Sequence, residues 1–225
     1  MNTPITANAD VNPTYGQYGV RPVDTLTGSA PIGRIAAYLD SFDPNNLWRP
    51  TGIPAIVTPG GIIAYPGLER HAVAAGLPKR IYRVRLIPEF YVPRYCLDAE
   101  GIKFTVFPYD ADRPPATISR IAEDALMLPA PNYPFQTHIP VLWGVVTDPS
   151  GAPVPNVSVA HRNNPPARDE QAITDARGTF AIALRWVSPN TVISIAAVDG
   201  RTRRSGAIQI KFPVDLGTSQ TIPIS

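Results

Sequence analysis

The stretches GVVTDPSGAPVPNVSV at residues 144–159 and TDARGTFAI at residues 174–182 decide the fold class of this chain. Within the first stretch, residues 148–151 read Asp-Pro-Ser-Gly, which matches the residue preferences of a type I turn. An apolar run precedes this turn, and Val157 and Val159 follow it as a short alternating segment. The pattern therefore predicts two β-strands that meet at a hairpin corner.

Alternation with a period of two continues around the second stretch and beyond it. Asp199–Gly200 is a strong signal for a two-residue turn between two of the later strands. Several short strands at this spacing predict a β-sandwich. The apolar positions that define the strands are Phe180, Ile182, Leu184, Trp186, Ile193, Ile195, Ile208, Ile210 and Phe212.

The two glycine turns and the strands around them resemble a carboxypeptidase regulatory-like domain over roughly residues 139–212. The resemblance implies a seven-stranded, transthyretin-like β-sandwich that serves as an accessory module and carries out no reaction. We expect Gly151 and Gly178 to occupy backbone positions that a Cβ atom would disfavour. Asp175 is expected to accept hydrogen bonds from amides of its own loop, and Phe180 to fill the core.

Composition excludes long helices in most of the chain. Among 225 residues there are 27 prolines and 16 glycines, which together are 19% of the sequence. This share stays below the roughly 25–30% that marks low-complexity disorder, and 44% of the residues are hydrophobic. We therefore expect a mainly β protein of short strands and many turns.

We predict three parts: an extended arm over residues 1–78, a small β-rich domain over 79–136, and the regulatory-like sandwich over 137–225. Proline or glycine recurs every few positions in the arm, without a sustained period of 2 or 3.6. Its apolar side chains need a surface to bury against, either the chain's own later domains or neighbouring subunits. We favour neighbouring subunits.

The middle part combines strand patterns with one helix pattern. Two alternating segments around residues 82–86 and 102–106 predict half-buried strands. Residues Ile118 to Met127 place apolar side chains on one helical face, after Thr117 as a possible N-cap, and they predict the only helix. Ile118 and Ile121 would also suit an irregular strand.

Charge and cysteine content exclude several classes of protein. The formal net charge is +2 and the charges are scattered, so we expect no nucleic-acid partner. Cys96 is the only cysteine, which rules out an intrachain disulfide framework. The N-terminus has no secretory signal pattern, and the apolar stretches are too short for a membrane span.

No residues suited to catalysis, cofactor binding or metal ligation can be named, and we expect a non-enzymatic protein without cofactors. His71, His138 and His161 are isolated, and no zinc-peptidase, phosphate-loop or esterase motif occurs. Trp143 and Trp186 could form a carbohydrate platform, but their strand positions favour packing in the core.

The chain combines a proline-punctuated arm, an appended β-sandwich and low net charge with no secretory signal and no disulfides. This combination is similar to that of minor virion proteins of tailed bacteriophages, especially tail or baseplate parts. We therefore predict a structural component of a symmetric assembly, located in the virion and made in the host cytoplasm, which packs on neighbouring subunits through its arm. The alternative is a carbohydrate- or peptide-binding surface module, whose binding loops would be residues 161–170 or 201–204. The alternative to a location in the virion is the bacterial cytoplasm or the cell surface.

Overall fold

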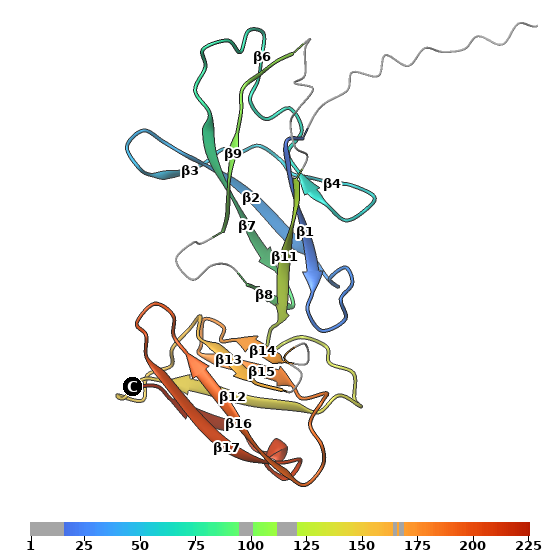
Figure 1. The fold of residues 1–225 in the computed structure, drawn as a ribbon, viewed down its shortest axis with the longest axis vertical. Coiled ribbons are helices and arrows are strands. Elements are labelled where there is room, and N and C mark those ends of the chain that lie inside the picture. Colours follow the sequence, from blue (N-terminus) through green and yellow to red (C-terminus); the bar gives the residue numbers. More distant parts are fainter. Residues whose placement is uncertain (1–15, 95–100, 112–120, 164–165, 167–168) are drawn as a thin grey trace, which may run out of the picture.

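The computed structural model describes residues 16–94, 101–111, 121–163, 166 and 169–225. These residues form β-strands almost throughout, which confirms the predicted mainly β fold. The strands gather into two units that lie one above the other along the long axis of the molecule (Figure 1). Cys96 lies outside the described residues.

The first unit contains two larger sheets and one small one. One sheet has the order β4-β5-β1-β11-β8, the second has the order β3-β2-β7-β9, and β10 pairs with β6. The strands are β1 (Tyr18–Asp24), β2 (Ile35–Phe42), β3 (Trp48–Pro50), β4 (Ile56–Val57), β5 (Ile63–Ala64), β6 (Arg70–His71), β7 (Arg80–Pro88), β8 (Tyr91–Pro93), β9 (Ile102–Val106), β10 (Tyr109–Asp110) and β11 (Ile121–Pro129).

The predicted boundary at residue 78 is wrong, because it separates strands of one sheet. β2, from the predicted arm, pairs antiparallel with β7, from the predicted middle domain. Leu39 and Tyr65 of the arm share a core with Val84 and Val106. Residues 16–78 therefore bury part of their apolar surface within their own chain, because the later strands supply the partner that extended chain needs. Residues 1–15 lie outside the described range.

The predicted helix is wrong over its described part. From Ile121 onward the chain forms β11, which runs parallel to β1 in a continuous register from Tyr18↔Ile121 to Asp24↔Met127. Ala125 and Met127 face the core, at a spacing of two. Pairing with β1 satisfies the backbone groups along this segment, and the prolines that follow prevent a helix from extending. Residues 118–120 lie outside the described range.

The second unit is a sandwich of two sheets, with the strand orders β15-β12-β18 and β14-β13-β16-β17. Phe180 is fully buried in its core, as predicted, together with Leu142 and Ile195. The elements are β12 (Val141–Thr147), β13 (Ser158–His161), β14 (Glu170–Ile173), β15 (Thr179–Ala183), β16 (Thr191–Val198), β17 (Ser205–Phe212), the 3-10 helix η2 (Val214–Gly217) and β18 (Gln220–Pro223).

Both glycine turns behave as the resemblance implies. Gly151 and Gly178 have φ angles of +85° and +71°, in the left-handed region that favours glycine. The Asp148 carbonyl accepts a hydrogen bond from Gly151 N at 2.9 Å, which closes the predicted turn. Asp175 Oδ1 accepts hydrogen bonds from the amides of Arg177 and Thr179, as predicted.

Candidate interaction sites

The loop over residues 199–204 is held by a buried aspartate. Asp199 is 2% exposed, and its Oδ1 accepts hydrogen bonds from the backbone and side chain of Arg201. Asp199 Oδ2 accepts from Thr202 Oγ1 at 2.8 Å. The loop connects β16 to β17 through six residues, so the predicted two-residue turn at Asp199–Gly200 is wrong. Asp199 N instead donates to the carbonyl of Arg204.

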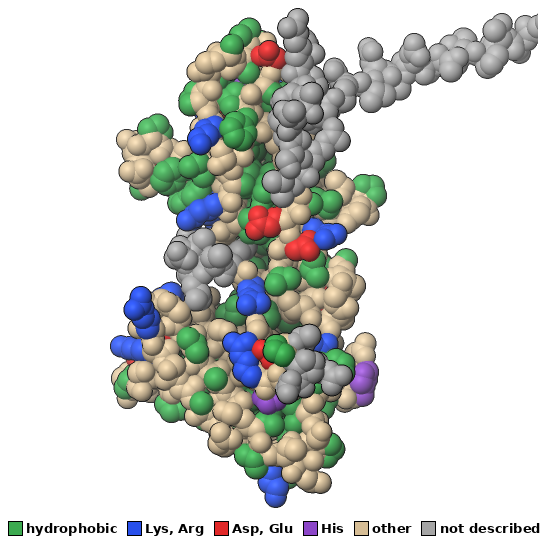
Figure 2. All heavy atoms as spheres, viewed as in Figure 1, with side chains coloured by type: hydrophobic (Ala, Val, Ile, Leu, Met, Phe, Trp, Pro, Cys, Tyr) green, Lys and Arg blue, Asp and Glu red, His purple; other side chains and the backbone are tan. Residues whose placement is uncertain are grey.

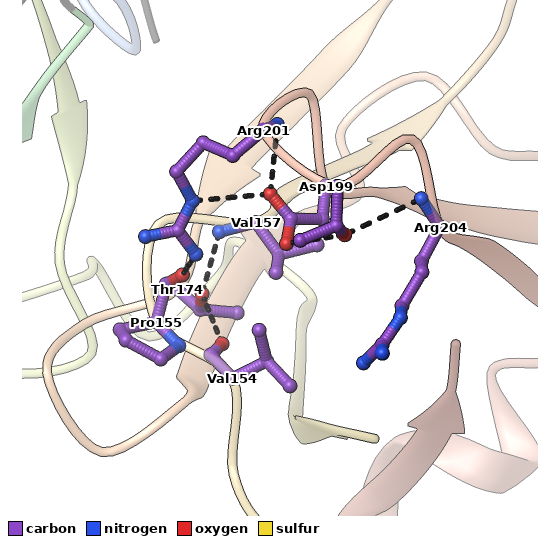
Figure 3. Close-up of polar contacts among 8 residues, drawn as sticks. Val154, Pro155, Val157, Thr174, Asp199, Arg201 and Arg204 are labelled. Atoms are coloured by element: carbon purple, nitrogen blue, oxygen red, sulfur yellow. Dashed lines mark hydrogen bonds and ion pairs between the residues drawn. The ribbon is translucent and has the colours of Figure 1, made fainter. Parts of the chain in front are cut away.

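The arginines of this loop have different surroundings. Arg201 reaches back across the end of the sandwich and donates to Pro155 O at 2.7 Å, whereas the Arg204 side chain points away from this network (Figure 3). Burial raises the pKa of Asp199, but hydrogen bonds from Thr202 and Arg201 outweigh burial and lower it overall. Arg201 therefore serves to fix the loop, which leaves it less suited to binding a ligand.

The second predicted binding loop, residues 161–170, has buried ends. His161 and Glu170 lie opposite each other on β13 and β14 and are 8% and 3% exposed. Between them, Arg162 Nη1 pairs with Asp169 Oδ2 at 2.7 Å on the surface. Glu170 is thus directed into the structure, at the end of the sandwich that faces the first unit.

Side chains of the second unit contact the first unit at this end. Arg185 Nη1 donates to the carbonyl of Leu26 at 2.6 Å, across 159 positions of sequence. The Phe135 and Trp143 rings meet edge to face, with centroids 6.2 Å apart. These contacts join the two units by a polar and an aromatic link.

The two predicted core tryptophans are not in the core. Trp143 and Trp186 are 39% and 50% exposed, respectively. Trp143 lies on the outer side of β12, and Trp186 follows the end of β15, beside the Arg185 guanidinium at 5.8 Å. The alternation that placed Trp186 in the core ends with the strand at Ala183, although Leu184 is still buried.

A polar cluster on β2 and β7 was missed by the sequence analysis. Asp40 is 1% exposed and accepts hydrogen bonds from two arginines of β7. Arg83 Nη2 lies 2.7 Å from Asp40 Oδ2, and Arg85 Nε lies 2.6 Å from the same oxygen. Burial raises the pKa of Asp40, but the hydrogen bonds from Arg85 and Arg83 outweigh it, so the pKa lies below its ordinary value.

Aromatic rings flank these cations on the side of the sheet opposite the core. The Arg83 guanidinium lies 4.6 Å from the Trp48 ring centroid, and Lys103 Nζ lies 6.0 Å from the same centroid. The Arg85 guanidinium lies 5.6 Å from the centroid of Tyr38. We call this surface the β7 outer face, and it comprises Tyr38, Trp48, Ile81, Arg83, Arg85, Ile87 and Lys103. The only sequence signal for it was the alternation of arginine with apolar residues along β7.

Charges on the face seen in Figure 2 do not gather by sign: blue and red side chains lie scattered over both units. Within the described ranges no group of three or more His, Cys, Asp and Glu residues could hold a metal ion. No helix in the part of the chain that the structure describes is long and apolar enough to cross a membrane.

Comparison with known proteins identifies the second unit. Residues 141–215 match the family model of the carboxypeptidase regulatory-like domain, which confirms the predicted domain for this third of the chain. A search of curated proteins finds no match for this chain.

Three solved structures are distantly similar to this chain. The chain is similar to the Bacillus anthracis TIE protein, at 14% identity and a TM-score of 0.29, over 93% of this chain and 33% of the other. For a streptococcal ancillary pilin, the values are 10% identity, a TM-score of 0.32 and coverages of 92% and 62%. The shaft pilin SpaA of Lactobacillus rhamnosus GG is 7% identical, with a TM-score of 0.30, over 92% of this chain and 96% of the pilin. At such TM-scores we base no argument on these likenesses.

Proposed function

We propose that the chain is a non-catalytic structural subunit that packs on neighbouring protein subunits of a larger symmetric assembly through the β7 outer face. The observation that carries the proposal is the exposure of Tyr38, Ile81 and Ile87 on this face, where they are 48%, 41% and 56% exposed. Aromatic and arginine side chains are enriched in protein interfaces and dominate their binding energy.

The wider surface of the first unit supports the same proposal. Of the sixteen large hydrophobic side chains that are exposed in the described residues, eleven lie between residues 32 and 107. This keeps the predicted role of the N-terminal half in packing on neighbours, but assigns it to a folded sheet in place of an extended arm. Single exposed hydrophobic residues are ordinary, whereas several on one sheet face indicate an interaction surface.

Incorporation into the assembly tests this surface. Tyr38→Glu combined with Ile87→Glu places two carboxylates on the β7 outer face, and Val192→Glu is the control on the exposed side of β16. Lysates of producing cells are separated by gradient sedimentation and blotted for the chain. We expect the wild type and the control in rapidly sedimenting fractions and the double variant near the top, with unchanged circular dichroism. A double variant that sediments like the wild type would refute the proposal.

The tail or baseplate of a tailed bacteriophage remains our proposal for the setting, with the virion as location. Its support is the combination of sequence features described above. Phage particles and envelope fractions, purified from one producing culture, separate this setting from the cell surface. We expect the chain in stoichiometric amounts in the particles. Its recovery only with the envelope would instead support the cell-surface alternative.

Binding of carbohydrate by the second unit is the other candidate function, and the exposure of Trp143 and Trp186 favours it. Exposed indole rings provide apolar faces on which sugar rings stack. A glycan array with the wild type and Trp186→Ala tests this function. Signals that disappear in the variant would support it, and an array without signals above background would exclude it for the glycans present.

A further inference from the structure

The β7 outer face carries more positive than negative charge. Asp40 is the only carboxylate in β2, β3, β7 and β9, whereas five residues of these strands are arginine or lysine. Two of the five have carboxylate partners outside these strands: Arg49 pairs with Asp43, and Arg80 Nε lies 3.6 Å from Glu69 Oε1. The cations that remain on the face with Asp40 are Arg83, Arg85 and Lys103.

Asp40 does not offset this charge toward solvent. Its side chain is 2% exposed, and it contacts the guanidinium groups of Arg83 and Arg85, whose side chains are 10% and 32% exposed. Lys103 is exposed and lies directly opposite Arg83 in the register of β7 and β9. Its ammonium group lies near the Trp48 ring and has no carboxylate partner within the described residues. The accessible charges of these four strands on this face are therefore positive.

The apolar side chains lie so that a subunit packed on them must also cover a cation. Side chains alternate along a strand, so Ile81 and Ile87 lie on the same side of β7 as Arg85, which stands between them. The two isoleucines are about 20 Å apart along the strand. Tyr38 on β2 lies directly opposite Arg85. A partner that buries Tyr38, Ile81 and Ile87 thus covers Arg85, with Lys103 on the neighbouring strand.

These cations require a partner with negative charge. An apolar surface over Arg85 and Lys103 would remove water from their charges without giving anything in return, which is costly. Carboxylates placed opposite them would offset this cost through charge-assisted hydrogen bonds and would also speed association. Phosphate groups would satisfy the same cations, but the exposed isoleucines beside them favour a protein surface, which brings apolar side chains as well.

We infer that the neighbouring subunit presents an acidic segment to the β7 outer face, with aspartate or glutamate carboxylates opposite Lys103 and Arg85. Apolar side chains of the same segment pack on Ile81 and Ile87. This inference rests on the proposed function, because it names the chemistry of the subunit that packs on this face.

Carbodiimide coupling of the rapidly sedimenting fractions tests the inference, because the reagent joins amines to carboxylates that are already in contact. The chain has three lysines, Lys79, Lys103 and Lys211, so mass spectrometry assigns each link to one of them. We expect an amide link from Lys103 Nζ to an aspartate or glutamate of another subunit, and its absence in Lys103→Arg. Failure to find this link, while other amines of the assembly have coupled, would overturn the inference.

Charge variants at Lys103 provide an independent test. Lys103→Glu places like charges opposite each other and should reduce the amount of the chain in the rapidly sedimenting fractions about tenfold or more. Lys103→Arg keeps the charge and should sediment like the wild type. Because Lys103 is exposed, we expect unchanged circular dichroism for both variants. Replacing the coupled carboxylate of the neighbour with lysine should return Lys103→Glu to the rapidly sedimenting fractions.

The outcomes separate this inference from the proposed function. If Tyr38→Glu combined with Ile87→Glu leaves the rapidly sedimenting fractions but Lys103→Glu stays in them, the acidic partner is wrong and the packing surface stands. A double variant that sediments like the wild type refutes the surface, and the inference with it. Release of the wild type from these fractions by nuclease would show that phosphate is the bound group and would also refute the acidic protein segment.

Discussion

The carboxamide of Gln17 forms two hydrogen bonds with the backbone of Phe107, 90 positions away in the sequence. Its Nε2 donates to the Phe107 carbonyl at 2.6 Å, and its Oε1 accepts from the Phe107 amide at 3.0 Å. Gln17 is 7% exposed, and Phe107 directly follows β9. The side chain therefore takes the place of a neighbouring strand and ties the first described residues to the chain that follows β9.

Replacing Gln17 with alanine should lower the free energy of unfolding by about 1–3 kcal/mol, because both backbone groups of Phe107 lose their partner. Gln209→Ala, on the exposed side of β17, is the matched control and should change stability by less than about 0.5 kcal/mol. Urea unfolding followed by circular dichroism measures both. Equal effects of the two substitutions would contradict this role for Gln17.

The two motif glycines should differ in their tolerance of alanine. A Cβ at Gly178 would lie 2.8 Å from Pro153 Cβ and 2.8 Å from Val154 N, whereas a Cβ at Gly151 would meet nothing within 4 Å. Gly151→Ala should cost about 1–2 kcal/mol for its left-handed backbone alone. Gly178→Ala adds overpacking, for a total of about 2–5 kcal/mol. Unfolding free energies check the order, and a larger loss at Gly151 would be inconsistent with the fold.

Asp40 should make the stability of the first unit sensitive to acid. Its pKa in the folded state lies below the ordinary value of 3.8, so the unfolded state binds more protons in this range. Its contribution is therefore complete above pH 3.8 and is lost as the pH falls through the folded-state pKa. Asp40→Asn should flatten the fall in stability below pH 3.8.

The same substitution should destabilise the protein at neutral pH by about 3–5 kcal/mol, because it breaks the buried ion pair between Asp40 and Arg83. Urea unfolding of the wild type and Asp40→Asn across this pH range provides both readings. An unchanged acid dependence in the variant would show that other carboxylates control it.

Arg185 should hold the two units in one orientation. Arg185→Gln removes the hydrogen bond from Nη1 to Leu26 O, while each unit keeps its own core. We expect a larger radius of gyration by small-angle scattering and faster proteolysis between residues 130 and 140, with an unchanged circular dichroism spectrum. Arg203→Gln is the control. If both variants match the wild type in scattering and in proteolysis, the prediction is wrong. The remaining contacts, including that of Phe135 with Trp143, would then be enough to hold the two units in one orientation.

Pairing partners explain the errors of the sequence analysis. The apolar positions from Ile118 to Met127 fit a helix as well as a strand, and pairing with β1 selects the strand for residues 121–127. Similarly, proline-rich extended chain at residues 16–78 has no local signal that names its partner. β7 and β11 provide that partner. The polar cluster around Asp40 could not be predicted either, because it combines residues from strands far apart in sequence.

The sequence by itself determined the mainly β fold, most strands of the second unit and its two glycine turns. Alternation of side chains and the conformational preferences of glycine, proline and aspartate act within a few residues, so a local pattern suffices for them. Only the tertiary structure decided which strands pair, which turn glycine has no room for a Cβ, and where Trp143 and Trp186 lie. These outcomes depend on contacts between distant segments, and burial and backbone pairing are satisfied only when the whole chain has folded.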